Sequence, residues 1–161
     1  MLNACFGHMP NPRLHTPKKT EITEPVAGDR FEERAFNALF ESKETLGIGQ
    51  LYRCHAARMD GYLVTTVGET VLLEMKECLG WGAVQAASAQ FLMGRKLLEL
   101  KATRAIIVFE RISDEWSRIL PSGGWGQLAL HASELSPHIE IGGLLIRDGS
   151  PVGPSKIVHP L

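Results

Sequence analysis

The stretch Val71-Leu72-Leu73-Glu74-Met75-Lys76 places an acid and a base directly after a run of apolar residues. A short apolar run of this kind, bounded by turn signals, is typical of a strand that is buried on both faces. Positions two apart in a strand share a face, so Glu74 and Lys76 are expected to point the same way. Because buried charges are costly unless they are paired or bind an ion, this pair needs a reason.

The same Glu-x-Lys spacing occurs twice more, at Glu41 with Lys43 and at Glu99 with Lys101. Both copies lie in stretches with helical periodicity, where the charges are expected in solvent near a helix end. Only the copy at Glu74 ends an apolar strand, so only this copy is a candidate site.

Composition predicts one ordinary globular domain, with 161 residues of which 44% are apolar and 22% charged. The formal charge of −1 gives no global signature of nucleic-acid binding. Three cysteines without a Cys-x-x-Cys pair favour reduced thiols and a cytoplasmic protein. The first nine residues lack the pattern of a signal peptide, and no apolar run approaches the ~20 residues of a membrane span.

The chain divides into three parts. Residues 1–27 carry four prolines and are predicted to form a loosely ordered arm, residues 28–147 a single domain, and residues 148–161 a tail. Cys5, His8 and His15 are candidate zinc ligands in the arm, but the arm has no fourth ligand at a recognisable spacing. Solvated residues are therefore the favoured interpretation there.

Residues 29–46 carry an apolar stripe with helical periodicity, and Gly47 is expected to end this helix. Glu32 falls within the stripe, so its carboxylate is expected to face the core. The segment from Asp29 to Glu32 also fits a capping box with Asp29 as N-cap. Both interpretations of Glu32 remain open.

Residues 50–56 and 60–66 are predicted strands, and residues 67–69 are the expected three-residue loop into the strand that ends at Lys76. In this register Asp60 faces Lys76, and Asp60 shares one face with Glu74 and Lys76. A two-residue loop would place Asp60 on the opposite face, as a simple turn residue.

A helix is predicted at residues 83–100 and another buried strand at residues 104–110. The strand–helix–strand sequence implies parallel strand pairing with a right-handed crossover. The helix is apolar enough to be largely buried, with Gln90 inside its apolar arc and Gln85 on its polar side. A buried Gln90 is satisfied either by nearby backbone or by the charged pair. Further along, residues 125–135 are a candidate helix and residues 139–146 a strand interrupted by Gly142 and Gly143.

Glu32, Asp60, Glu74, Lys76 and Gln90 are the unexpected polar residues of this arrangement. Carboxylates that converge at one strand repel unless they are protonated or bridged by a cation. Oxygen ligands of this kind suit Mg²⁺ or Mn²⁺. A metal ion held there can support phosphodiester hydrolysis, with an adjacent lysine orienting water or offsetting charge.

This pattern resembles the PD-(D/E)xK nuclease superfamily over residues 28–110. The matching residues are Gly28 and Glu32 in a Gly-x-x-x-Glu opening, Asp60-Gly61, Glu74-Met75-Lys76 and Gln90. The opening is nearest in style to the archaeal Holliday-junction-resolvase-like branches, while Met59 stands where the family usually has proline. The resemblance implies an α/β fold, the restriction-endonuclease-like α-β-β-β-α-β core, with a mixed central sheet flanked by helices.

The resemblance also implies an Mg²⁺- or Mn²⁺-dependent endonuclease or exonuclease. It makes Asp60, Glu74 and the backbone carbonyl of Met75 the metal ligands and Lys76 the catalytic base or stabiliser. Glu32 and Gln90 are the supporting catalytic residues.

The implied partner is nucleic acid, with DNA favoured over RNA. Arg58, Arg95 and Lys96 are candidate nucleic-acid contacts, and Arg53 and Arg104 could extend one basic rim; ordinary solvated charge is the alternative. With a charge of −1 we expect weak binding by one chain, improved by a homodimer or a partner protein. Two other functions fit the pattern. One is a nuclease-fold subunit of little or no activity that binds nucleic acid or a partner protein, and the other is a binding domain in which Glu74 and Lys76 form an ion pair.

Overall fold

The computed structural model describes residues 16–115 and 139–152, which form an α/β structure around a mixed sheet of seven strands. The strands are β1 (Lys18–Glu21), β2 (Ile48–His55), β3 (Gly61–Thr65), β4 (Thr70–Leu79), β5 (Arg104–Ile112), β6 (Glu140–Arg147) and β7 (Ser150–Val152). The helices are α1 (Phe31–Glu41), α2 (Lys43–Leu46) and α3 (Trp81–Leu97). The elements from α1 to β5 therefore follow the predicted order of helix, three strands, helix and strand.

The seven strands lie side by side in sequence order, with β4 in the middle. Strands β1 to β4 pair antiparallel, β4 to β6 pair parallel, and β7 returns antiparallel to β6. The predicted parallel pairing across α3 is therefore confirmed, and so is the prediction of a mixed α/β sheet. In the described part of the chain, no helix is both long and apolar enough to cross a membrane.

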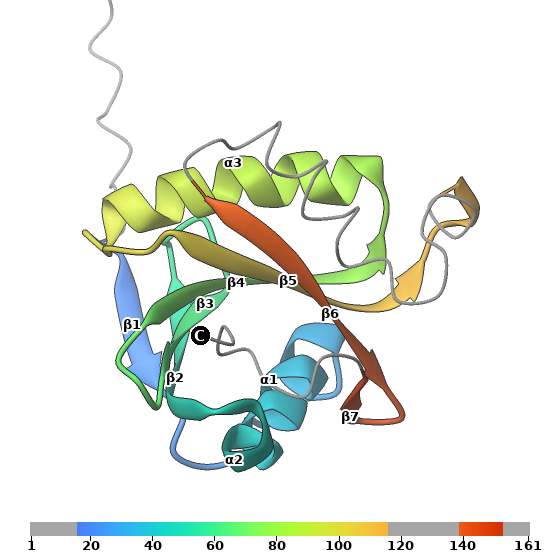
Figure 1. Ribbon diagram of the computed structural model, residues 1–161, viewed down its shortest axis with the longest axis horizontal. Helices are drawn as coiled ribbons and strands as arrows, with labels where there is room; N and C mark the ends of the chain where they lie inside the picture. Colours follow the sequence, from blue (N-terminus) through green and yellow to red (C-terminus); the bar gives the residue numbers. More distant parts are fainter. Residues whose placement is uncertain (1–15, 116–138, 153–161) are drawn as a thin grey trace, which may run out of the picture.

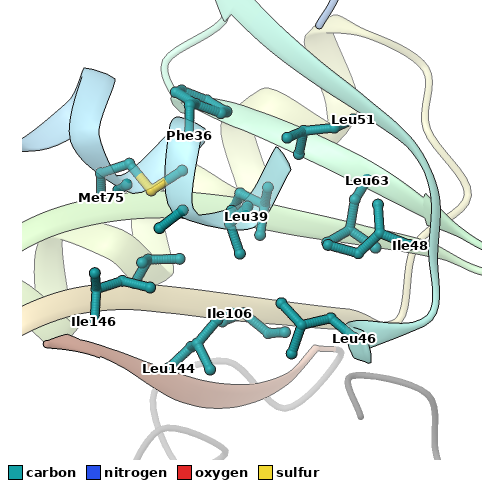
Figure 2. Close-up of a cluster of buried hydrophobic side chains, with 14 of the residues drawn as sticks. Phe36, Leu39, Leu46, Ile48, Leu51, Leu63, Met75, Ile106, Leu144 and Ile146 are labelled. Atoms are coloured by element: carbon teal, nitrogen blue, oxygen red, sulfur yellow. The ribbon is translucent and has the colours of Figure 1, made fainter. Parts of the chain in front are cut away.

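Helices α1 and α2 pack on one face of the sheet and α3 on the other (Figure 1). On the first face, Phe36 and Leu39 of α1 pack with strand residues in a buried cluster (Figure 2). Strand β4 alternates between the two cores, because Leu73 and Met75 belong to the α1 side and Leu72 to the α3 side. By the same alternation, Glu74 and Lys76 point to the α3 side, as predicted.

The turn between β3 and β4 differs from the prediction. Gly61 pairs with Leu73 and Val64 with Thr70, so residues 65–69 connect the strands and the predicted register is wrong by two residues. The longer turn forms because Thr65 accepts from the backbone N–H of Glu69 through its hydroxyl and donates its own N–H to the Glu69 carbonyl. A shift of two preserves the face, so Asp60 still lies on the side of Glu74 but opposite Glu74 rather than Lys76.

The boundaries of several elements also differ. Lys18–Glu21 and Ser150–Val152 belong to the sheet, whereas the sequence placed them in the arm and the tail. Both are short edge strands that add backbone pairing without an apolar pattern of their own, as the fully exposed β1 shows. The predicted first helix begins at Phe31, breaks at Ser42 and ends as expected at Gly47, which has a φ of 70°.

The sequence also predicted an interruption of the last long strand that the structure does not show. Gly142 and Gly143 lie within an uninterrupted β6, paired with β5. The candidate zinc ligands Cys5, His8 and His15 and the predicted helix at residues 125–135 lie outside the described residues.

Candidate active site

Asp60 and Glu74 are held side by side by reciprocal hydrogen bonds between β4 and the residue that precedes β3. The backbone N–H of Asp60 donates to Glu74 Oε2 at 3.1 Å. The backbone N–H of Met75 donates to Asp60 Oδ2 at 2.7 Å. Each carboxylate is therefore fixed by a backbone N–H of the segment that carries the other, and the two acids converge as the sequence predicted.

Lys76 and Gln90 complete this cluster from the α3 side. The ammonium of Lys76 donates to Glu74 Oε1 at 2.7 Å and to Gln90 Oε1 at 2.8 Å. Gln85, in contrast, is exposed on the other side of α3. The predicted placement of Gln90 next to the charged pair is confirmed, while the roles assigned to these residues stay predictions.

Burial sets the protonation of the two acids. The Glu74 side chain is only 2% exposed. Its burial, together with the nearby negative charge of Asp60, raises its pKa to about 7 against the opposing effect of Lys76. Burial also raises the pKa of Asp60, although the hydrogen bond from the Met75 N–H opposes that rise. Near neutral pH the pair therefore tends to retain a proton, which a cation would displace.

The loop that carries Asp60, residues 56–60, is strained and closely packed. Ala56 and Arg58 have φ values of 56° and 64°, a left-handed conformation that costs side-chain-bearing residues about 1–2 kcal/mol each. Between them Ala57 is buried, and Met59 is buried against α3, so the side chain of Arg58 is left exposed. The loop holds Asp60 in place because its alternate residues are anchored in the core.

The close contact with α3 depends on Gly94. A Cβ atom at Gly94 would lie 2.5 Å from Met59 Cγ and 2.9 Å from the carbonyl oxygen of Ala57. Gly61 plays a similar part at the start of β3, where a Cβ would lie 2.3 Å from the carbonyl oxygen of Tyr52 and 2.9 Å from the ring of Phe36. Neither glycine has a positive φ, so close packing rather than backbone conformation requires them.

An open pocket of about 590 Å³ lies beside the acid pair. It is lined by residues 53–60 and by Arg30, Glu32, Ala89, Gln90 and Met93. Asp60 and Gln90 thus contribute to the pocket surface, while Glu74 is buried behind them. The pocket gives a ligand access to Asp60, with Glu74 next to it, from the side of loop 56–60.

Glu32 lines this pocket from α1, but it takes neither of the two positions that the sequence predicted, while its supporting role stays a prediction. Its carboxylate accepts from Arg53 Nε at 2.9 Å and is 29% exposed, so it lies at the rim of the core rather than within it. The capping-box prediction is wrong, because Arg30 is the N-cap and no side chain caps the helix. The helix begins at Phe31, and this leaves Asp29 outside the capping position.

Glu33 is the residue that the sequence interpretation missed. Its side chain is 5% exposed and binds both Arg30 and Arg53, with Arg53 Nη2 at 3.1 Å from Glu33 Oε1. Arg30, followed by Arg53, lowers the pKa of Glu33 to about 2. Glu33 lies off the apolar stripe, and its burial comes instead from the preceding segment, since a Cβ at Gly28 would lie 2.9 Å from Glu33 Cγ. The Arg30–Glu33 spacing of three was the available signal.

The predicted single basic rim is not formed. Arg53 and Arg58 line the pocket, but Lys96 is exposed on α3 and does not line it. Arg95 donates to the carbonyl oxygen of Ala102 at 3.0 Å, and Arg104 is paired with Glu69 at the turn before β4. Only two of the five predicted cations therefore line the pocket. The other three lie near the site in the sequence, but their side chains on α3 and β5 point in other directions.

A divalent cation would find two carboxylates here rather than a larger cluster. Within residues 16–115 and 139–152, no three His, Cys, Asp or Glu side chains converge as a metal site. Asp60 and Glu74 still fit Mg²⁺ or Mn²⁺, which bind one or two carboxylates and retain several waters. In the described part of the chain, no donor is bonded to Asp60 Oδ1, so one oxygen of the pair is open to a ligand.

Comparison of the chain with protein-family models, with curated protein sequences and with solved structures gives no match in any of the three. A function is therefore inferred only from the chemistry and geometry of the site.

Proposed function

We propose that this protein is a metal-dependent nuclease that hydrolyses phosphodiester bonds of nucleic acid, DNA in the first place. The observation that carries the proposal is the backbone-locked pair of Asp60 and Glu74 with Lys76 bonded to Glu74. A buried acid and a half-buried acid held together destabilise a fold unless a proton or cation lies with them. Such an arrangement lowers the stability of the fold, but it provides the ligands of a metal site.

Each residue of the site has a different expected role in hydrolysis. Asp60 and Glu74 would hold Mg²⁺ or Mn²⁺ together with the backbone carbonyl of Met75, as the resemblance to the PD-(D/E)xK nucleases implies. The bound metal would supply Lewis-acid activation of a phosphodiester and of a water. Lys76 lies within hydrogen-bond distance of Glu74, so its ammonium can orient the attacking water or offset charge on the phosphate.

Gln90 and Glu32 support these groups from two other elements. Gln90 accepts from Lys76 and so directs the ammonium toward the acid pair. Glu32 lines the same pocket as Asp60 and is held there by Arg53. The restriction-endonuclease-like core is likewise a proposal, supported by the order of elements from α1 to β5 and by the position of Asp60, directly before β3, next to Glu74 on β4.

A second candidate is a nuclease-fold subunit with little or no activity that binds nucleic acid or a partner protein. It is favoured by the presence of only two converging acids in the described residues and by the formal charge of −1. Such a subunit would bind metal without cleaving.

The test is incubation of the pure protein with labelled duplex DNA, single-stranded DNA, branched DNA and RNA, in Mn²⁺ or in EDTA. The nuclease proposal predicts cleavage of at least one substrate in Mn²⁺ and of none in EDTA. Mn²⁺ binding with no cleavage would support the second candidate. Absence of both would make Glu74 and Lys76 an ion pair of structural value only.

A further inference from the structure

The pocket beside the acid pair has two unlike walls. Loop 56–60 supplies the exposed Arg58 and the carboxylate of Asp60, and α3 supplies Ala89, Gln90 and Met93. Met93 is 48% exposed. The core does not require this side chain, because Val84, Ala87 and Phe91 already fill the face of α3 that packs on the sheet.

An apolar wall next to a phosphodiester site restricts the substrate. In a duplex the faces of the bases are stacked on one another, and only phosphates, sugars and base edges are accessible in the grooves. A methionine side chain is flexible and polarisable and makes favourable contacts with aromatic rings. Met93 can pack on the face of a base only where that face is uncovered, as in single strands, overhangs and bulges.

The charged side chains around the pocket also favour an unpaired substrate over a long duplex. Arg30 and Arg53 also line it, but each is bound to Glu33, and Arg53 to Glu32 as well. Arg58 is the arginine at the pocket for which the described residues show no ion pair. One available arginine suits one or two phosphates, whereas firm binding of a long duplex rests on neutralising many.

We propose that this pocket takes an unpaired nucleotide, with its base against Met93 and Ala89 and its phosphate between Arg58 and the acid pair. The inference rests on the proposed nuclease function and narrows its substrate class. The volume of about 590 Å³ lies within the range of about 300–1,000 Å³ that is typical of small-molecule pockets. The unpaired nucleotide can belong to a free single strand or to an unpaired part of a duplex.

The test uses one labelled oligonucleotide in three forms: alone, annealed to a full complement, and annealed to a shorter complement that leaves an overhang. Cleavage in Mn²⁺ is followed for the wild type, Met93→Ser, Met93→Leu and Leu92→Ser. Leu92 is the matched control, because it is an exposed apolar residue of α3 (38%) that does not line the pocket.

We expect cleavage of the single strand and of the overhang at least tenfold faster than of the full duplex. Met93→Ser should raise the KM for unpaired substrates about threefold to tenfold with little change in kcat, the loss expected for a methionine contact with an aromatic ring. Met93→Leu should restore the KM, and Leu92→Ser should leave it unchanged. Cutting confined to the overhang, with the free strand spared, would assign the substrate to unpaired parts of a duplex.

Equal or faster cleavage of the full duplex, or equal losses in Met93→Ser and Leu92→Ser, would overturn the inference. Binding of the same three oligonucleotides, measured by fluorescence anisotropy in Ca²⁺, tests the preference for unpaired nucleotides independently of cleavage. A single-strand preference in binding without any cleavage would overturn the nuclease function alone. A duplex preference in binding would overturn the unpaired-nucleotide site whatever the activity.

Discussion

At the scale of single residues, Lys76 is the group whose removal best separates chemistry from structure. Lys76→Met keeps the length of the side chain while it removes the ammonium that bonds Glu74 and Gln90. We expect the rate of Mn²⁺-dependent cleavage to fall by about 10²-fold or more, as for other losses of a charge-stabilising donor. The melting temperature should change little, because Lys76 is partly exposed and Glu74 is already disposed to hold a proton.

Lys101→Met is the control for this substitution. Lys101 belongs to a second Glu-x-Lys copy, is exposed and lies outside the pocket. Kinetic assays and thermal melts of both variants test whether Lys76 contributes to cleavage rather than to stability. Equal losses of activity in the two would remove Lys76 from the site.

The pH dependence of stability follows from Glu74, which lies next to Asp60 and accepts a hydrogen bond from Lys76. Its pKa is about 7 in the folded protein against an ordinary value of 4.5. Between these values the folded state holds a proton that the unfolded chain has lost, so stability falls as the pH rises from about 4.5 to about 7. The free energy of unfolding of the wild type should fall by at most about 3 kcal/mol relative to that of Glu74→Gln over this pH interval.

Denaturant unfolding of both proteins without metal, at several pH values, measures this difference. Mn²⁺ competes with the proton, so it should raise the melting temperature of the wild type more at pH 8 than at pH 5.5. A pH slope that is identical in Glu74→Gln would show that another group is responsible.

At the scale of elements, the contact of α3 with loop 56–60 positions the site. Gly94→Ala would push a methyl group against Met59 and the carbonyl oxygen of Ala57, and the second contact cannot be relieved by a side-chain rotation. We expect a loss of about 1–3 kcal/mol of stability, typical of overpacking. Activity should fall as well, because the loop carries Asp60.

Gly82→Ala in the same helix is the matched control. A Cβ at Gly82 meets nothing within 4 Å, so alanine there should leave activity unchanged and stabilise the helix by up to about 1 kcal/mol. Chemical denaturation and cleavage assays test both variants. Similar stability changes in the two would contradict the proposed packing of the loop on α3.

The long elements could be predicted from the sequence because each has a strong pattern of its own. Strand β4 and helix α3 appear where their apolar residues indicated, to within a few residues. The prediction that α3 is largely buried is wrong, because its apolar residues Leu92, Met93 and Leu97 are exposed. The short edge strands β1 and β7 could not, since their stability comes from pairing with β2 and β6 rather than from their own residues. The turn of residues 65–69 was also missed, because the bonds that Thr65 makes with Glu69 are not visible in composition.

At the scale of the whole molecule, the near-neutral charge makes nucleic-acid binding depend on the pocket. We expect weak, salt-sensitive binding of a short single strand by the wild type. Arg58→Ala should weaken it and reduce the slope of log K against log salt by about one, whereas Lys96→Ala, outside the pocket, should leave both nearly unchanged. Anisotropy titrations at several salt concentrations measure this, and an equal effect of the two variants would contradict the special position of Arg58.

The candidate site could be predicted as far as the alternation of side chains along a strand determines which face of the sheet each side chain occupies. Alternation placed Asp60, Glu74 and Lys76 on one face even though the register was wrong by two, because an even shift keeps the face. The contact of Arg53 with Glu33 was not predictable, since only the fold brings together these two residues, which are 20 positions apart in the sequence.

The most direct test of the central claim is the rate of nucleic-acid cleavage at saturating Mn²⁺ by the wild type and by Glu74→Gln. Glutamine keeps the size of the side chain and its place next to Asp60 while it removes the negative charge that would bind metal. The acid pair as a metal site predicts a loss of at least about 10²-fold in rate, with a melting temperature no lower than that of the wild type at pH 7. Undiminished cleavage by a folded Glu74→Gln protein would contradict it.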